Sequence, residues 1–105
     1  MMFIVNSEEI IGKEIHETLG LVRGSATRSR SVVSDFVAAL KNIIGGEVHE
    51  YTKLLADTRE QAVSRMIKDA EKMEADAIVN VRITTSTISQ GTSEILAYGT
   101  AVKLK

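Results

Sequence analysis

The 105-residue chain carries a formal net charge of −1 at pH 7, contains no cysteine, and is 44% apolar and 26% charged. This length predicts one domain, residues 1–105, with a core of its own, and the composition is that of a folded globular protein. The small net charge argues against nucleic acid as a partner, because phosphate binding usually needs a basic surface. The absence of cysteine excludes disulfides, thiolate metal ligands and cysteine nucleophiles.

Signals for export or membrane insertion are missing from the sequence. The apolar run at residues 2–5 is too short for a signal peptide. No stretch approaches the roughly 20 apolar residues that a transmembrane helix needs. We therefore expect a cytoplasmic protein without a membrane among its partners.

The first part of the chain has the pattern of two strands. Met2–Val5 is a short apolar run, and the polar segment Asn6–Lys13 that follows is typical of a loop. Glu14–Thr27 is rich in Ile, Leu, Val and Thr and largely alternates apolar with polar residues, which predicts a long strand. Gly20 and Gly24 interrupt it, and a glycine inside a strand often marks a bulge or a close approach of another backbone.

Two helices are predicted in the middle of the chain. In the first, apolar residues recur at helical spacing from Val33 to Ile44, Ser31 can cap the N-terminus, and Gly45-Gly46 ends the pattern. The second runs from about Val48 to Ala75, with its apolar stripe at Val48, Tyr51, Leu55, Ala62, Met66, Ala70 and Met73. The alanines in this stripe should let the helix lie close to its packing partner.

From Ala77 onward the period changes to two, which predicts a hairpin with its turn at Gln90-Gly91 and a return strand over Ile95–Leu104. One face of the return strand carries residues small enough for a helix to approach: Ile95, Ala97, Gly99 and Ala101. The elements together predict an α+β domain in the order ββααββ, ending in a long C-terminal β-hairpin.

The length of this hairpin predicts self-association. About 12 residues at ~3.3 Å each make an arm near 40 Å, longer than the roughly 33 Å diameter of a compact domain of this size. Such a hairpin curls strongly or projects beyond its own core. Projecting apolar edges promote aggregation unless another subunit covers them, and closed symmetric assembly is the usual solution.

Several short motifs occur in a characteristic order along nearly the whole chain. They are Asp35-Phe36, Ile43-Ile44-Gly45-Gly46, Tyr51, Thr58-Arg59-Glu60-Gln61-Ala62, Ala75-Asp76-Ala77-Ile78-Val79, Arg82 and Tyr98-Gly99-Thr100-Ala101-Val102. In order and spacing they resemble the YbjQ-like family of small bacterial and archaeal proteins, whose label refers to heavy-metal binding. One departure is Glu74, because that family usually has glycine at this position. The glutamate predicts that the second helix continues a residue or two further.

The resemblance implies an antiparallel sheet with two helices packed on it and a ring-shaped homopentamer. It implies no securely assigned activity. We carry no metal-binding residue over from the family label.

The histidines are the candidates for a metal site. His16-Glu17 and His49-Glu50 are the only His-Glu pairs, and imidazole with carboxylate suits an ion such as zinc. Neither histidine has a second histidine four residues on. We therefore predict exposed polar residues and no metal site, the alternative being a ring that gathers one histidine per subunit around its axis.

A candidate anion site precedes the first predicted helix, in the segment 24–31. Helix N-termini present free N–H groups to anions, and Arg28 and Arg30 add charge and fork-shaped donors beside Ser31. Arg23 is a third candidate donor upstream. The alternative is a capped helix with surface arginines that pair with carboxylates across a subunit boundary.

No constellation in the sequence specifies a reaction or a cofactor. We predict a non-enzymatic homo-oligomer, pentameric by the resemblance, that binds a small anionic ligand or partner at subunit interfaces through Arg28, Arg30 and Ser31. Two alternatives remain open. One is a metal-binding or metal-response protein, and the other is an enzyme for a small anion with a site completed across an interface.

Overall fold

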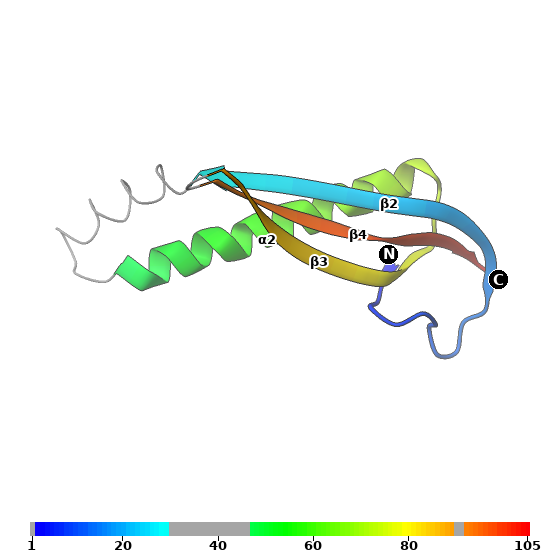
Figure 1. Cartoon of the computed structure of the whole chain (residues 1–105). Coiled ribbons are helices and arrows are strands. Elements are labelled where there is room, and N and C mark those ends of the chain that lie inside the picture. The colour runs from blue at the N-terminus through cyan, green and yellow to red at the C-terminus, as the bar shows by residue number, and fades with distance from the viewer. Residues whose placement is uncertain (1, 30–46, 90–91) are drawn as a thin grey trace.

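The computed structural model describes residues 2–29, 47–89 and 92–105. Its elements are four strands and one long helix: β1 (Phe3–Ile4), β2 (Ile15–Ser29), α2 (Glu47–Lys72), β3 (Ala77–Ser89) and β4 (Thr92–Leu104). The helix lies along one face of the sheet (Figure 1). The β2 strand and the C-terminal hairpin are close to their predicted bounds, and the turn residues 90–91 lie outside the described residues.

The sheet has the order β1-β3-β4-β2 and is mixed. β2 and β3 pair antiparallel with β4, whereas β1 pairs parallel with β3, with Phe3 opposite Ala77. The prediction of an antiparallel sheet is therefore wrong. The direction of a strand as short as β1 is not encoded in its apolar pattern, and here the N–H of Val5 donates to the carbonyl oxygen of Ile78 at 3.0 Å.

The predicted arrangement of two helices on this sheet, in the order ββααββ, is also wrong for the residues that the structure describes. These contain one helix, α2, which packs on β2 and β4. The helix expected from Ser31 to Ile44 falls outside the described residues.

The helix α2 ends at Lys72, short of the predicted Ala75, because the chain turns at Glu74. Glu74 has a φ of 59°, in the left-handed region. The N–H of Ala75 donates to the carbonyl oxygen of Ala70 at 3.2 Å, and the N–H of Glu74 donates to that of Glu71 at 3.0 Å. This pair of bonds is the Schellman motif, which usually has glycine in the left-handed position. The expectation that a glutamate here would prolong the helix is wrong.

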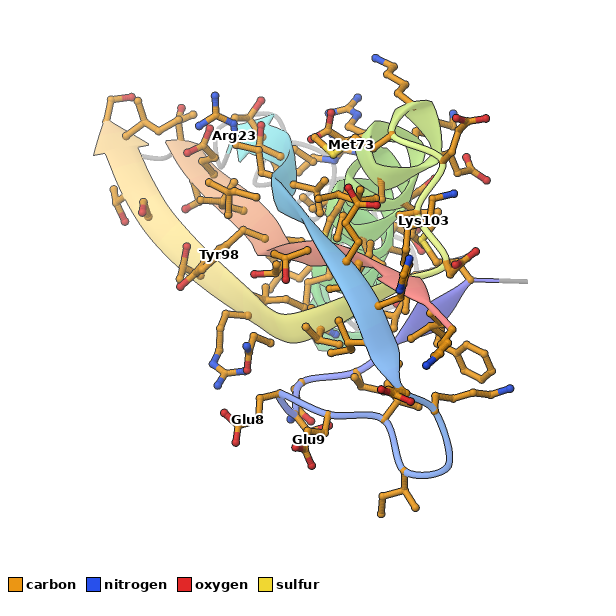
Figure 2. The ribbon with its side chains drawn as sticks, turned by 90° about the vertical axis from the view of Figure 1, so that its right-hand side faces the viewer. Glu8, Glu9, Arg23, Met73, Tyr98 and Lys103 are labelled. Atoms are coloured by element: carbon orange, nitrogen blue, oxygen red, sulfur yellow. The ribbon has the colours of Figure 1, made fainter. Side chains whose placement is uncertain are left out.

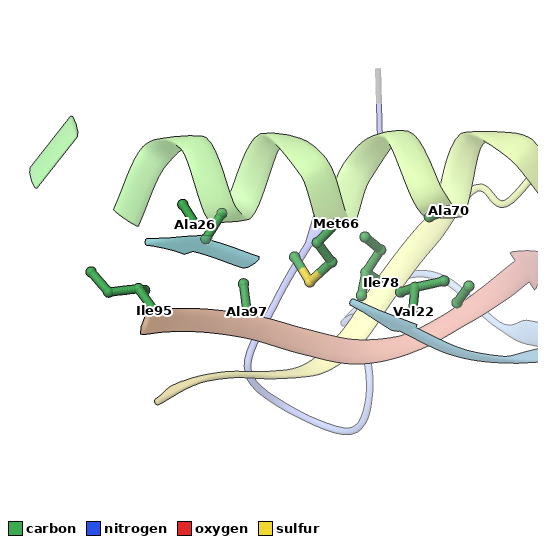
Figure 3. Packing of buried hydrophobic residues seen from close by; sticks show 9 residues of the cluster. Val22, Ala26, Met66, Ala70, Ile78, Ile95 and Ala97 are labelled. Carbon is green, nitrogen blue, oxygen red and sulfur yellow. The ribbon is translucent and has the colours of Figure 1, made fainter. Parts of the chain in front are cut away.

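The core lies between α2 and the sheet (Figure 3). Its buried residues are mostly small or aliphatic: Val22, Ala26, Ala62, Met66, Ala70, Ile78, Ile95, Ala97 and Ala101. The predicted small face of the return strand is thus the face that the helix covers. A second, smaller cluster of Ala77, Val79 and Val102 lies on the opposite face, where Val5 and Ile10 of the N-terminal segment pack against it.

The closest contact between helix and sheet is at Gly24. A Cβ atom on this residue would overlap the backbone of Ala62, Arg65 and Met66 in α2. The other predicted irregularity, Gly20, has a φ of 136° and follows a register shift in β2 at Thr18. Of the two interior glycines, one therefore allows a close approach and the other forms part of a bulge.

The molecule is elongated, with principal extents of 56 × 26 × 20 Å and a radius of gyration of 17.2 Å. A compact domain of about 100 residues has a radius of gyration near 13 Å. At the end of the molecule away from the chain termini, α2 extends further than the strands do (Figure 1).

We expect Gly24→Ala to destabilise the fold by about 3 kcal/mol, the upper end of overpacking costs, because the clash is with helix backbone that no rotamer change relieves. Urea denaturation followed by circular dichroism measures the change. Ser25→Ala, on the neighbouring residue whose side chain points to the other face, is the matched control and should change the unfolding free energy by less than about 0.5 kcal/mol. Equal stabilities for the two variants would contradict the packing described here.

Glu74→Gly should stabilise the protein by about 0.5 to 1 kcal/mol. The substitution removes the cost of a left-handed side-chain residue, and part of this gain is offset by the greater freedom of glycine in the unfolded chain. The melting temperature should rise by a few degrees. Glu74→Ala keeps the strained backbone conformation and should not raise the melting temperature. If both variants stabilise the protein, the gain comes from removing the negative charge of Glu74 and not from relieving backbone strain.

Candidate functional site

The three predicted ligand-binding residues are only partly placed by the structure. Arg28 lies near the end of β2, whereas Arg30 and Ser31 lie outside the described residues. The guanidinium of Arg28 donates from Nη1 to the carbonyl oxygen of Thr27 at 2.9 Å. It also reaches α2, where Nη2 donates to Oε1 of Gln61 at 3.4 Å. Both acceptors are uncharged, so these bonds position the cation without neutralising it.

A second arginine reaches the same place from the helix. Arg65 follows Gln61 by four residues, which makes the two neighbours on the helix surface, and its Nη1 donates to the carbonyl oxygen of Ser25 on β2. Arg28 reaches from strand to helix and Arg65 from helix to strand. Sequence reasoning missed Arg65 because it lies 40 residues from its partner Ser25, and no local pattern relates the two.

These contacts cap the outer edge of β2, the last strand of the sheet. Arg23, Ser25 and Thr27 alternate along the strand, so their backbone polar groups point to the same side. The N–H of Arg23 donates to Oδ2 of Asp69 at 3.1 Å, and the carbonyl oxygens of the other two accept from Arg65 and Arg28. We refer to this row of side chains, Arg28, Arg65 and Asp69, as the β2 cap.

The candidate anion site is the part of the β2 cap that contains Arg28 and Arg65. A guanidinium presents five N–H donors in a plane. The hydrogen bonds above use two donors of Arg28 and one of Arg65, which leaves others for a carboxylate or phosphate. Arg28 is half-buried and Arg65 exposed, so an anion can approach from solvent or from a neighbouring subunit.

Arg23, the third candidate donor, does not join this site. It lies opposite Tyr98 of β4, whose other neighbour is Arg82 of β3. Arg28 follows Arg23 by five positions, an odd number, in a stretch without register shifts, so their side chains lie on opposite faces of the sheet. Arg23 and Tyr98 are labelled in Figure 2. Arg82 instead secures the N-terminal segment, donating to the carbonyl oxygen of Asn6 at 2.8 Å.

The histidines do not form a metal centre with other described residues. His16 is exposed on β2, and His49 lies within the first turns of α2. Within residues 2–29, 47–89 and 92–105, no group of three or more His, Asp or Glu side chains is placed to hold an ion. In the same part of the chain, no helix has the length and hydropathy needed to cross a bilayer.

A separate hollow of about 580 Å³ lies at the C-terminal end of α2. Glu71, Glu74 and Asp76 contribute carboxylates to it, beside Phe3 and Leu104. Asp76 is already used within the fold, because its Oδ2 accepts from the N–H of Leu104 at 2.9 Å. The negative charge here would repel an anion, so this hollow does not extend the candidate site.

Comparison with known proteins places the chain in a family. A family model described as "putative heavy-metal-binding" matches residues 2–105. The chain belongs to the YbjQ family. Among its relatives, a UPF0145 protein of Photobacterium profundum is 55% identical over 103 residues, which is 98% of this chain and 100% of the relative. A UPF0145 protein of Methanosarcina acetivorans is 50% identical over 98% of this chain and 97% of its own length.

A solved structure agrees with the fold at low sequence identity. It is the crystal structure of a protein of unknown function from Pediococcus pentosaceus, assigned to the DUF74 family. The alignment covers 99% of this chain and 98% of that one, with a TM-score of 0.59 and 16% identity. At this identity the likeness concerns the fold alone. The resemblance to the YbjQ family found in the motifs is confirmed, and the names of these relatives assign no activity.

Asp69 tests whether the β2 cap stabilises the strand edge. Asp69→Ala should lower the unfolding free energy by about 1.5 to 3 kcal/mol, because it removes a charged acceptor from the Arg23 N–H. Asp69→Asn keeps an oxygen acceptor and should retain at least half of that stability. Urea denaturation of both variants measures the difference. Equal losses would show that a neutral oxygen acceptor for the Arg23 N–H retains none of the stability, and no loss in either variant would show that the bond contributes nothing.

Proposed function

We propose that this protein is a non-enzymatic homo-oligomer that binds a small anion at its subunit interfaces. The observation that carries the proposal is that Arg28 and Arg65 donate to backbone carbonyl oxygens only two residues apart on β2, those of Thr27 and Ser25. Arg30 and Ser31, which follow two and three residues after Arg28, belong to the proposed site. A pentameric ring is the form of assembly implied by the family resemblance.

The shape of the chain supports self-association. A radius of gyration of 17.2 Å means that a small chain exposes more surface than a compact domain would. Large apolar side chains remain exposed away from the core, among them Leu21 at 62% and Ile88 at 58%. Single exposed apolar residues are ordinary, but on β2, which holds Leu21, and on β3, which holds Ile88, they are positions that a neighbouring subunit can cover.

The chemistry of the site supports a carboxylate or phosphate as its ligand. Planar guanidinium groups match both anions through paired N–H donors. The site lies on the last strand of the sheet, so a subunit packed against this edge would enclose the two arginines and reduce their contact with water. Charge-assisted hydrogen bonds strengthen as water is excluded.

A panel of anions tests the proposal, with phosphate, citrate and succinate each compared against potassium chloride of equal ionic strength. A ligand present at a hundred times its Kd stabilises the folded state by about 2.7 kcal/mol, enough to raise the melting temperature by roughly 10 °C. The double variant Arg28→Ala/Arg30→Ala and the single variant Arg65→Ala should lose this rise. Arg23→Ala, on the opposite face, is the control and should keep it.

Light scattering on the same samples measures assembly. The pentameric form has five times the 11.5 kDa mass of the chain. A monomer at all concentrations would refute the assembly, and the absence of any anion-specific rise in melting temperature would refute the ligand.

A further inference from the structure

The outer edge of β3 is open over most of its length. β1 covers this edge only at Ala77 and Ile78. From Arg82 to Ser89 every residue is exposed, and in the part of the chain that the structure describes no strand pairs with it on that side. In Figure 2 this half of β3, in yellow, lies at the outside of the sheet.

The chemistry of this edge favours strand pairing. Residues 83–89 read Ile-Thr-Thr-Ser-Thr-Ile-Ser, with no charged residue and no proline. Edge strands are normally protected by charges, proline or a covering element. The other edge of the same sheet follows that rule over Arg23–Thr27, where Asp69, Arg65 and Arg28 occupy three outer backbone groups of β2. The two edges therefore differ in kind: one is capped and the other is open.

The backbone groups available on β3 can be assigned from its bulge. The register with β4 shifts between Val79 and Arg82, and the N–H of Val81 points outward to the carbonyl oxygen of Val5 at 3.0 Å. Because outward and inward groups alternate along a strand, the N–H and C=O of Ile83, Thr85 and Thr87 also point outward. The next register shift comes after Thr87, so the regular stretch ends there.

We propose that this edge pairs antiparallel with the same edge of a second copy of the chain, around a two-fold axis at Thr85. On β2, helix and strand side chains occupy outer backbone groups of Arg23, Ser25 and Thr27. Register shifts interrupt β2 between Ile15 and Gly20, which leaves β3 with the longer regular open stretch among the described residues. A two-fold axis requires one residue to oppose itself. Thr85 is the centre of the regular stretch 83–87 and one of the residues whose polar groups point outward.

This register is self-complementary along its length. It sets Thr85 opposite Thr85 of the second copy, Ile83 opposite Thr87 and Thr84 opposite Ser86. No like charges oppose one another, and threonine and serine pairs across strands are favourable. Ile83, which is 47% exposed in the single chain, gains a neighbour on the same face of the extended sheet.

The inference rests on the self-association proposed above but adds a different contact. A two-fold pairing joins chains in twos, so the particle contains an even number of chains. A five-fold ring alone contains an odd number. The two proposals therefore predict different masses and can fail separately.

Cross-linking tests the register, and the cysteine-free chain provides a clean background. Opposed residues in a hydrogen-bonded antiparallel pair have Cα atoms ~5.5 Å apart, within the range of a disulfide. Thr85→Cys should form a covalent dimer under mild oxidation. Thr84→Cys, at a residue that is also exposed but lies opposite Ser86, places its two sulfurs too far apart and should stay monomeric on a denaturing gel.

Thr85→Pro tests the pairing itself by light scattering, because it removes an outward N–H and leaves the bonds to β4 in place. Circular dichroism and thermal melting check that the variant is folded. We expect an even-numbered native particle that falls to half its mass in this variant, with cross-linking at Thr85 and not at Thr84. A particle of five chains whose mass does not change in Thr85→Pro would overturn the β3 pairing but not the ring. A monomer in both the native protein and the variant would overturn both proposals.

Discussion

The contact between α2 and β2 at Gly24 is the constraint on which the rest of the structure depends. With no side chain on Gly24, the helix backbone lies directly against the strand. The helix meets the sheet through Ala62 and Ala70, with Met66 between them, so the two layers lie close together. Asp69 and Arg65 can reach the backbone of β2 only because the helix lies this close to its edge. The capped edge and the candidate anion site are both consequences of one missing side chain.

The two edges of the sheet have different roles in this view. The β2 edge satisfies its backbone groups with charged side chains, which prevents another strand from adding there and leaves guanidinium groups facing outward. Within the described residues, the β3 edge has no such protection beyond Arg82; its threonines and serines are neutral, and threonine is strongly strand-forming. A protein with one capped and one open edge can associate in an ordered way, because only one side of each sheet accepts a strand. Uncontrolled growth needs two open edges.

Features that depend on spacing along the chain were predictable from the sequence. Gly20 and Gly24 marked a bulge and a close approach, and the small residues Ala97, Gly99 and Ala101 marked the face that lies under the helix. The family followed from motifs spread over the whole chain.

Features that depend on distant partners were not predictable. The parallel pairing of β1 is made by a few backbone bonds, and Arg65 joins Arg28 only through the packing of α2 on β2. The helix end was predicted wrongly at Glu74. Tertiary packing holds this residue in a left-handed turn, although a glutamate by itself disfavours that conformation.

The place of β4 in the sheet has a consequence for how the chain acquires its fold. β4 lies between β2 and β3, so it holds together strands that do not touch one another. It is also the last element in chain order. A ribosome therefore releases β2, α2 and β3 before the strand that joins them exists, and the open β3 edge is then accompanied by a second unpaired edge on its inner side. Docking of residues 92–104 pairs the facing edges of β2 and β3 and ends this exposure.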